Sequence, residues 1–211
     1  MNTTVKKALI IGTPFFTLMV SIYISTFLTH FLTSPMDKDW VTRQFLIGIF
    51  MFVGLTIIPR LLHFQLFFSG AIPSFRVNLS HHSPAMQVDH EFKLGNHFVC
   101  SGCLGNILSI ILAEFLFLAY FIEPSCFSPT FTTFLVGIMA ILISYSRYFI
   151  ILKPSIRLIQ HVSLFIGVSL IVIACDIAFK SAFSMILLLP TWILFLIVRL
   201  KLGELDHRSF Q

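Results

Sequence analysis

Long apolar runs alternate with short polar intervals along this 211-residue chain. Each run holds roughly 20 residues, enough for a helix that rises about 1.5 Å per residue to cross a bilayer core about 30 Å thick. The pattern predicts an all-α fold, a polytopic transmembrane helix bundle of about six spans in a single domain, residues 1–211. The predicted spans are residues 8–32, 44–68, 104–122, 131–152, 155–179 and 183–200.

The second run has the weakest pattern of the six. Pro59, Arg60 and His63 interrupt its later half, which predicts a kink or an early exit into the headgroup region. If this run is only a re-entrant segment, the number of spans becomes odd.

The composition indicates an integral membrane protein. Hydrophobic residues make up 57% of the chain and charged residues only 11%, whereas a soluble domain carries about 25% charged residues. Its main partner is therefore the lipid bilayer, and the 25 phenylalanines are expected to face lipid or pack between helices. The net charge of +5 is too small and too scattered to predict nucleic-acid binding. No small-residue cleavage site follows the first run, so we expect a retained helix there and not a signal peptide.

The distribution of lysine and arginine predicts the orientation of the chain. Six spans place both termini on one side, where ten cations fall, against three on the other side. Cytoplasmic segments carry the excess of Lys and Arg, so we expect both termini and the segment between the second and third runs in the cytoplasm, with the spans in the cell membrane. The ten are Lys6, Lys7, Arg76, Lys93, Arg147, Lys153, Arg157, Arg199, Lys201 and Arg208; the three are Lys38, Arg43 and Lys180, and Arg60 lies inside the second run.

The longest polar interval begins at Leu79 and runs directly into the third span. The stretch from Leu79 to Ala113 is rich in possible metal ligands. It holds four of the eight histidines and two of the four cysteines. Thiolates and imidazoles are zinc ligands, and a C-x-x-C spacing lets two sulfurs converge on one ion. A reducing cytoplasm favours metal ligation over a disulfide. The interval therefore predicts a zinc-type loop over residues 79–103; the alternative is a polar loop whose histidines and cysteines have no joint role.

Within this interval, His81-His82 are followed by Cys100-Ser101-Gly102-Cys103-Leu104-Gly105. In these motifs the chain resembles domain-of-unknown-function family 2085, small predicted multi-pass membrane proteins. Their signature has a Cys-His pair, a polar loop and then Cys-Ala-Arg-Cys-Thr-Gly leading into a helix. Phe92 and Gly95 stand where the family places an aromatic residue and a glycine, and the stretch from Pro154 to Gly167 is similar to its later Ser-Asn-x-x-Arg helix start.

The resemblance covers roughly residues 79–170 and has clear departures. His81 replaces a cysteine, Gly102 replaces the usual arginine, and the Asp-Gly-x-x-Gln segment before the fifth run is missing. The resemblance implies a fold and a site. It brings no activity, because none is established for the family.

The ligand set that the resemblance implies is Cys100, Cys103 and His82, with His81 as the fourth ligand and His90 and His97 as rivals for that place. Four filled positions would form a closed structural site that fixes the loop to the helix start. A fourth position left to water would be catalytic. We expect the closed version.

A second alternative to metal binding is a thiol redox relay through Cys100 and Cys103, but such a relay needs a second dithiol or a partner protein. Cys126 is expected on the opposite side of the membrane and Cys175 lies within the fifth run, so neither is expected to reach the pair. A c-type haem is not expected, because Leu104 stands where a histidine would be needed.

Three polar residues within the predicted spans are further candidates, since charge inside a bilayer is costly. Glu114 lies eleven residues beyond Cys103, about 16 Å along the helix and near the bilayer centre. Asp176 and Lys180, spaced i,i+4, are expected to pair or to snorkel, and His161 lies one turn from Arg157. A proton or ion path could use Glu114, Asp176 and His161; otherwise each is a buried polar tie between helices.

Two functions of different kinds follow from these features. The first is an accessory or structural subunit whose metal loop docks other membrane protein subunits. The second is a small transporter or membrane enzyme that combines the loop metal with Glu114. An enzyme is the less expected of these, because the chain shows no glycine-rich phosphate loop, no Ser/His/Asp order and no paired carboxylates.

Overall fold

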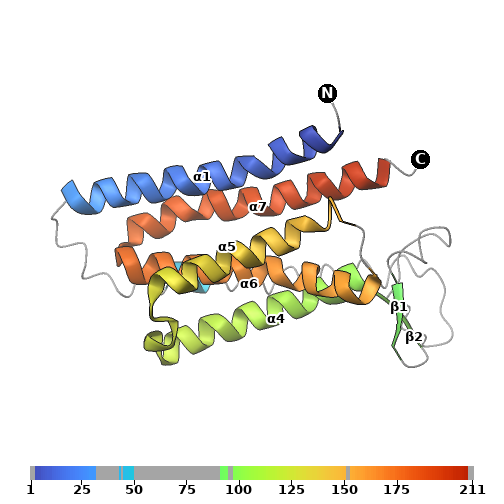
Figure 1. The fold of residues 1–211 in the computed structure, drawn as a ribbon. Coiled ribbons are helices and arrows are strands. Elements are labelled where there is room, and N and C mark those ends of the chain that lie inside the picture. The colour runs from blue at the N-terminus through green and yellow to red at the C-terminus, as the bar shows by residue number, and fades with distance from the viewer. Residues whose placement is uncertain are drawn as a thin grey trace.

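The computed structural model describes residues 3–31, 43, 45–49, 91–94, 97–150 and 153–208. Most of this part of the chain is helical, as the apolar runs predict. The long helices are α1 (Thr3–Phe31), α4 (Ser101–Ile122), α5 (Thr130–Ser146), α6 (Pro154–Phe179) and α7 (Ala182–Arg208), and a short 3-10 helix, η2 (Pro124–Phe127), joins α4 to α5. They lie side by side in one bundle (Figure 1).

The bundle has two distinct ends. Both chain termini, the β1–β2 hairpin and the connection between α5 and α6 lie at one end, which we call the terminal end (Figure 1). The last turn of α1, η2 and the turn between α6 and α7 lie at the other, the far end. The helix α1 finishes at the far end, and α4 begins at the terminal end.

Within the described ranges, three helices are long and apolar enough to cross a membrane: α1 over Lys7–Phe27, α4 over Leu104–Ile122 and α6 over Ser155–Phe179. Shorter apolar stretches cover Thr130–Ser146 in α5 and Phe183–Phe195 in α7. Large apolar side chains face outward, among them Phe16, Phe115 and Phe131, as in helices surrounded by lipid. The predicted helical bundle of a membrane protein is confirmed in this form. The second predicted run, 44–68, lies almost wholly outside the described residues, so the count of six spans stays a prediction.

One predicted boundary is wrong, and one helix is longer than its predicted span. The fourth span was expected to reach residue 152, but α5 ends at Ser146 and Arg147 occupies its C-cap. Reversing the chain between two antiparallel helices needs several residues, and these come from the end of the apolar run. Pro154 then starts α6 at a position where its missing N–H costs nothing. The sixth span was expected to end at 200. The helix α7 itself continues through the charged tail to Arg208, and its apolar stretch covers Phe183–Phe195.

Helix α6 is the centre of the bundle and contacts α4, α5 and α7. Its side chains are buried without a break from Gly167 to Asp176. Ser109 ties α4 to it: the hydroxyl donates to Val162 O at 2.5 Å and accepts from Phe165 N at 3.1 Å. In the neighbouring pair α1 and α7, Ser21 lies 3.3 Å from the Thr191 hydroxyl and 3.2 Å from Leu187 O. Hydrogen bonds of this kind fix helix pairs where water is absent.

Glycines bring α5 and α6 into close contact. A Cβ added to Gly167 would lie 2.7 Å from Gly137 O and 2.7 Å from Ile141 Cγ1. A Cβ added to Gly137 would lie 2.9 Å from Gly167 O and 2.8 Å from Ile171 Cγ1. The two glycines therefore face one another, and the two backbones approach closer than any side chain would allow.

The polar interval before α4 was predicted to be a loop throughout. Its last part instead forms a hairpin. Strand β1 (Glu91–Leu94) pairs antiparallel with β2 (His97–Cys100), with Glu91 opposite Cys100 and Leu94 opposite His97. The sequence signal for this hairpin is the two-residue spacer Gly95-Asn96, a dipeptide suited to tight hairpin turns. The rest of the interval, including residues 79–90, lies outside the described residues.

Candidate functional site

The hairpin and α4 place the two cysteines of the C-x-x-C pair at one junction. Strand β2 ends at Cys100, α4 begins at Ser101, and Cys103 lies in its first turn. Residues three apart at a helix start are neighbours, so the backbone arrangement is compatible with two sulfurs on one ion. The junction lies at the terminal end of the bundle (Figure 1).

The predicted histidine ligands are less well placed by the structure. His97 is the first residue of β2, and His81, His82 and His90 lie outside the described residues. Within the described ranges, no group of three or more His, Cys, Asp or Glu residues is assembled that could hold a metal. The set Cys100, Cys103, His82 and His81 therefore stays a prediction.

Gly105 allows the start of α4 to pack closely against α6. A Cβ at this position would lie 2.4 Å from His161 Cβ and 3.1 Å from Leu158 O. The close approach requires glycine and holds the helix turn that follows Cys103 directly against α6. The C-x-x-C junction is thus attached to the central helix of the bundle and not to a mobile surface element.

The other two cysteines are far from the pair, as predicted. Cys126 is exposed in η2 at the far end, and Cys175 is 3% exposed within α6. The 22 residues of α4 separate Cys126 from the C-x-x-C junction, about 33 Å at 1.5 Å per residue.

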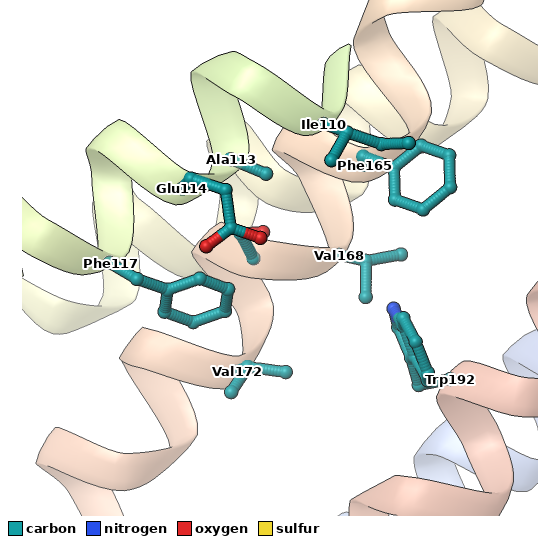
Figure 2. Close-up of a pocket in the computed structure, with 9 residues that line it drawn as sticks. Ile110, Ala113, Glu114, Phe117, Phe165, Val168, Val172 and Trp192 are labelled. Atoms are coloured by element: carbon teal, nitrogen blue, oxygen red, sulfur yellow. The ribbon is translucent and has the colours of Figure 1, made fainter. Parts of the chain in front are cut away.

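Glu114 lies in a recess between α4, α6 and α7 (Figure 2). The recess offers about 10 Å³ to the centre of a water molecule, room for roughly one water. Oε2 of Glu114 is buried there, and no residue of the described part of the chain donates a hydrogen bond to it. Apart from Glu114 itself, the lining residues are Ile110, Ala113, Phe117, Phe165, Val168, Ser169, Val172 and Trp192.

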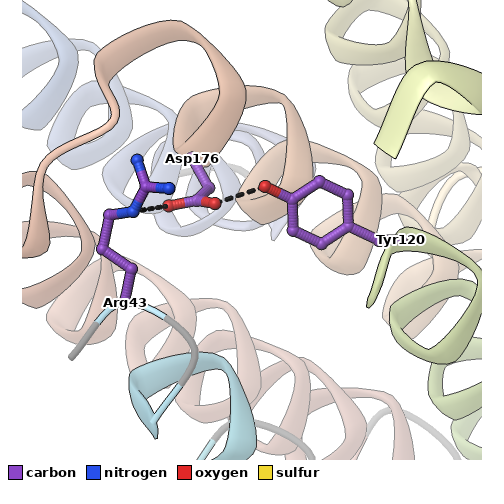
Figure 3. A network of polar contacts seen from close by, with 3 residues as sticks. All are labelled: Arg43, Tyr120 and Asp176. Carbon is purple, nitrogen blue, oxygen red and sulfur yellow. Dashed lines mark hydrogen bonds and ion pairs between the residues drawn. The ribbon is translucent and has the colours of Figure 1, made fainter. Parts of the chain in front are cut away.

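Asp176 forms a buried polar network near the far end (Figure 3). Its Oδ2 accepts a short hydrogen bond from the Tyr120 hydroxyl of α4. Its Oδ1 lies 3.5 Å from Arg43 Nε, in an ion pair whose Asp176 side chain is 0% exposed. Asp176 and Lys180 were expected to pair or to snorkel. Their contact is the helical bond from Lys180 N to Asp176 O, and the exposed Lys180 side chain fits the snorkelling alternative and not the pairing.

Sequence reasoning missed the roles of Arg43 and Tyr120. Arg43 was counted only as a charge at a membrane boundary, although it is 9% exposed in the structure. An arginine next to a long apolar run gives no sign of whether it faces headgroups or the bundle. The one available signal was the lone acidic residue in the fifth run, which needs a cation or a hydroxyl donor nearby.

His161 contacts Arg147, which lies in the connection after α5. The Arg147 Nη1 atom lies 2.5 Å from His161 Nδ1 and 3.3 Å from Nε2. An arginine can only donate, so the ring nitrogen accepts. This contact at the terminal end was not predicted, because the two residues belong to different helical runs.

The structure does not bring the three intramembrane polar residues together. His161 lies at the terminal end of α6, Ser169 borders the Glu114 recess, and Asp176 lies near the far end. Seven or eight residues separate these positions along α6, or about 10–12 Å at each step. Glu114, Asp176 and His161 thus lie at three separate places in the bundle.

Comparison of the chain with family models, with curated proteins and with solved structures gives no match. The resemblance to the family of small membrane proteins therefore rests on the quoted motifs alone.

Proposed function

We propose that the chain is a six-span protein of the cell membrane that serves as an accessory or structural subunit of a membrane complex, with a structural zinc-type site in residues 79–103. The observation that carries the proposal is the position of Cys100 and Cys103 at the end of β2 and in the first turn of α4. A closed site there would fix the preceding polar segment to the bundle and present it to a partner.

The small recesses within the bundle favour a structural role over a transport role. The Glu114 recess and a second one beside Trp192 each offer only about 10 Å³ to the centre of a water molecule. A small-molecule site usually needs a cavity of roughly 300–1,000 Å³. The described helices thus form a packed body that suits assembly with other subunits.

The arrangement of the ends supports a cytoplasmic terminal end. Of the described cations, Arg43 and Lys180 belong to far-end elements, and the others belong to terminal-end elements, in keeping with an excess of cytoplasmic positive charge. The helix α1 ends at the far end and the strand β1 lies at the terminal end, an arrangement that suits the proposed second span. A membrane-impermeant thiol reagent added to intact cells is expected to label the exposed Cys126 and to spare Cys100 and Cys103. Labelling of Cys100 after metal removal would contradict this orientation.

Purified protein is expected to carry about one zinc ion per chain, measured by elemental analysis. Because thiolates bind the ion directly, Cys100→Ser and Cys103→Ser should abolish binding, and His82→Ala should weaken it. His90→Ala and His97→Ala should have smaller effects. Cys126→Ser is the matched control, since this exposed cysteine lies at the opposite end of the bundle.

The cysteine variants should still insert, because membrane helices satisfy their own backbone hydrogen bonds. Protease should, however, cut between Leu79 and Cys103 faster in the variants, and partner chains that copurify in fixed ratio with the parent protein should be lost. A metal-free parent protein whose cysteine variants keep the same protease pattern would exclude the zinc site. A metal-loaded protein that purifies without partners would exclude the accessory role alone.

The second candidate function is a small transporter or membrane enzyme that uses the loop metal and Glu114. The buried Oε2 of Glu114, without a hydrogen bond from the described residues, favours it, because such a carboxylate must take up a proton or a cation to stay buried.

Glu114→Gln separates the two candidates. If Glu114 only ties helices together, the neutral isostere should leave stability and partner binding nearly unchanged. If it carries protons or cations, flux into liposomes should be lost at equal protein levels. Glu123→Gln is the matched control, since Glu123 is exposed at the far end. Flux that survives Glu114→Gln would exclude the transport role of this residue.

A further inference from the structure

The turn that follows α5 presents a cation that has no acidic partner among the described residues. Arg147 is half-buried, and its contacts are with the His161 ring and with Tyr148, whose hydroxyl accepts from Nη2. The guanidinium carbon also lies 4.4 Å from the centre of the Tyr148 ring. The ion pair between described residues is Arg43–Asp176, at the far end, so Arg147 has no described carboxylate to balance its charge.

These contacts hold the guanidinium in place and leave part of it available. Arginine has five N–H donors in a planar fork, and two of them are used by His161 and Tyr148. Tyr148 is itself buried against Tyr145, with ring centres 6.3 Å apart. A cation positioned by a rigid aromatic support loses little freedom when it binds an anion.

Another cation shares this corner of the bundle. Lys7 of α1 donates from Nζ to Tyr148 O at 3.4 Å, which places its ammonium beside the backbone of the residue after Arg147. Positive charge from α1 and from the α5–α6 connection therefore gathers at one place.

Apolar side chains directly beside this cluster point to a lipid. Phe149 is 47% exposed and Ile150 is 52% exposed, immediately after the Arg147-Tyr148 pair. A free anion would gain nothing from them, whereas acyl chains would cover them. Helix α5 has 17 residues, about 25 Å, so its ends lie close to the boundary between hydrocarbon and headgroups.

We propose that Arg147, with Lys7, binds the phosphate group of an acidic phospholipid at the terminal end, while Phe149 and Ile150 contact its acyl chains. The chemistry is recognition of a phosphate by a guanidinium fork and an ammonium group. This site is separate from the C-x-x-C junction and does not depend on a metal.

Native mass spectrometry of the full-length protein from nanodiscs of phosphatidylcholine mixed with phosphatidylglycerol tests the proposal. The parent protein should retain phosphatidylglycerol in preference to phosphatidylcholine. Arg147→Gln should weaken this retention about fivefold, the effect expected for one basic residue near an anionic headgroup, and Arg147→Lys should restore part of it. Lys180→Gln is the matched control: it removes one exposed cation at the far end and should change nothing.

Four results would overturn the proposal. An equal loss in Lys180→Gln would mean that net charge and not this corner selects the lipid. Equal retention of both lipids by the parent protein would mean that no acidic-lipid site exists. Thermal stabilisation by inorganic phosphate that matches the stabilisation by phosphatidylglycerol, and that Arg147→Gln removes, would identify a free anion as the ligand. If Arg147→Gln does not fold, Lys7→Gln on a different helix must show the same selective loss, and unchanged retention in that variant would also overturn the proposal.

Discussion

Asp176→Ala is expected to destabilise the bundle by about 3–5 kcal/mol, the usual cost of removing one partner of a buried ion pair. The Asp176 side chain is fully buried, with Arg43 on one oxygen and Tyr120 on the other. Without the carboxylate, an arginine that is only 9% exposed has no balancing charge among the described residues. Reversible unfolding in mixed detergent micelles, followed by circular dichroism, measures the difference.

Two further variants separate the charge from the hydrogen bond. Tyr120→Phe removes only the bond to Oδ2 and should cost about 1.5–3 kcal/mol, as for other hydrogen bonds to a charged group. The double variant Arg43→Met with Asp176→Leu removes both charges and should be close to the parent in stability, because the ion pair at 3.5 Å has no hydrogen bond between Nε and Oδ1. A double variant as unstable as Asp176→Ala alone would show that the pair is needed for more than mutual neutralisation.

Gly167→Leu is expected to have the largest effect among the packing substitutions, and Gly167→Ala should already cost about 1–3 kcal/mol, the range for overpacking. The added Cβ would lie 2.7 Å from Gly137 O and 3.0 Å from Ile141 N. Both are backbone atoms of α5 and cannot move aside as a side chain would. The two central helices must therefore separate along their whole contact, which a lower midpoint of thermal unfolding in detergent would report.

Gly12→Ala is the matched control for this prediction. Gly12 also lies within a helix, but no atom lies within 4 Å of the position its Cβ would take. The substitution should be neutral or stabilising by up to about 1 kcal/mol, because alanine favours a helix more than glycine does. The double variant Gly137→Ala with Gly167→Ala should cost less than the sum of the single variants, since helices already separated no longer clash. Additive losses would argue against direct contact between the two glycines.

Much of the fold was predictable because apolar length determines it. The expected spans 104–122 and 155–179 agree closely with α4 and α6. The errors lie where length is not the controlling factor. The end of α5 depends on the residues needed to reverse the chain before Pro154, and the hairpin depends on a two-residue turn signal within a stretch interpreted as loop.

The candidate site was less predictable, because partners from distant runs decide what a polar residue does. Asp176 was correctly identified as a costly group, but its partners come from residues 43 and 120, and no spacing rule connects them. His161 was assigned to its own helix, although its contact is with Arg147 in the connection before that helix. In the sequence, Gly105 appeared only as one position of the cysteine motif. In the structure, the close approach of α4 to α6 explains why this position requires glycine.

The connection between α6 and α7 has a consequence for biosynthesis. Only Lys180 and Ser181 separate the two helices, and Lys180 closes α6 in a left-handed conformation with φ of 47°. Two helices joined so tightly emerge from the ribosome as one hairpin. The apolar part of α7, Phe183–Phe195, is short, whereas α6 offers an apolar stretch of 25 residues. We therefore expect α6 and α7 to insert into the bilayer as a single unit. The longer apolar stretch of α6 would drive the insertion of α7, whose apolar stretch is shorter.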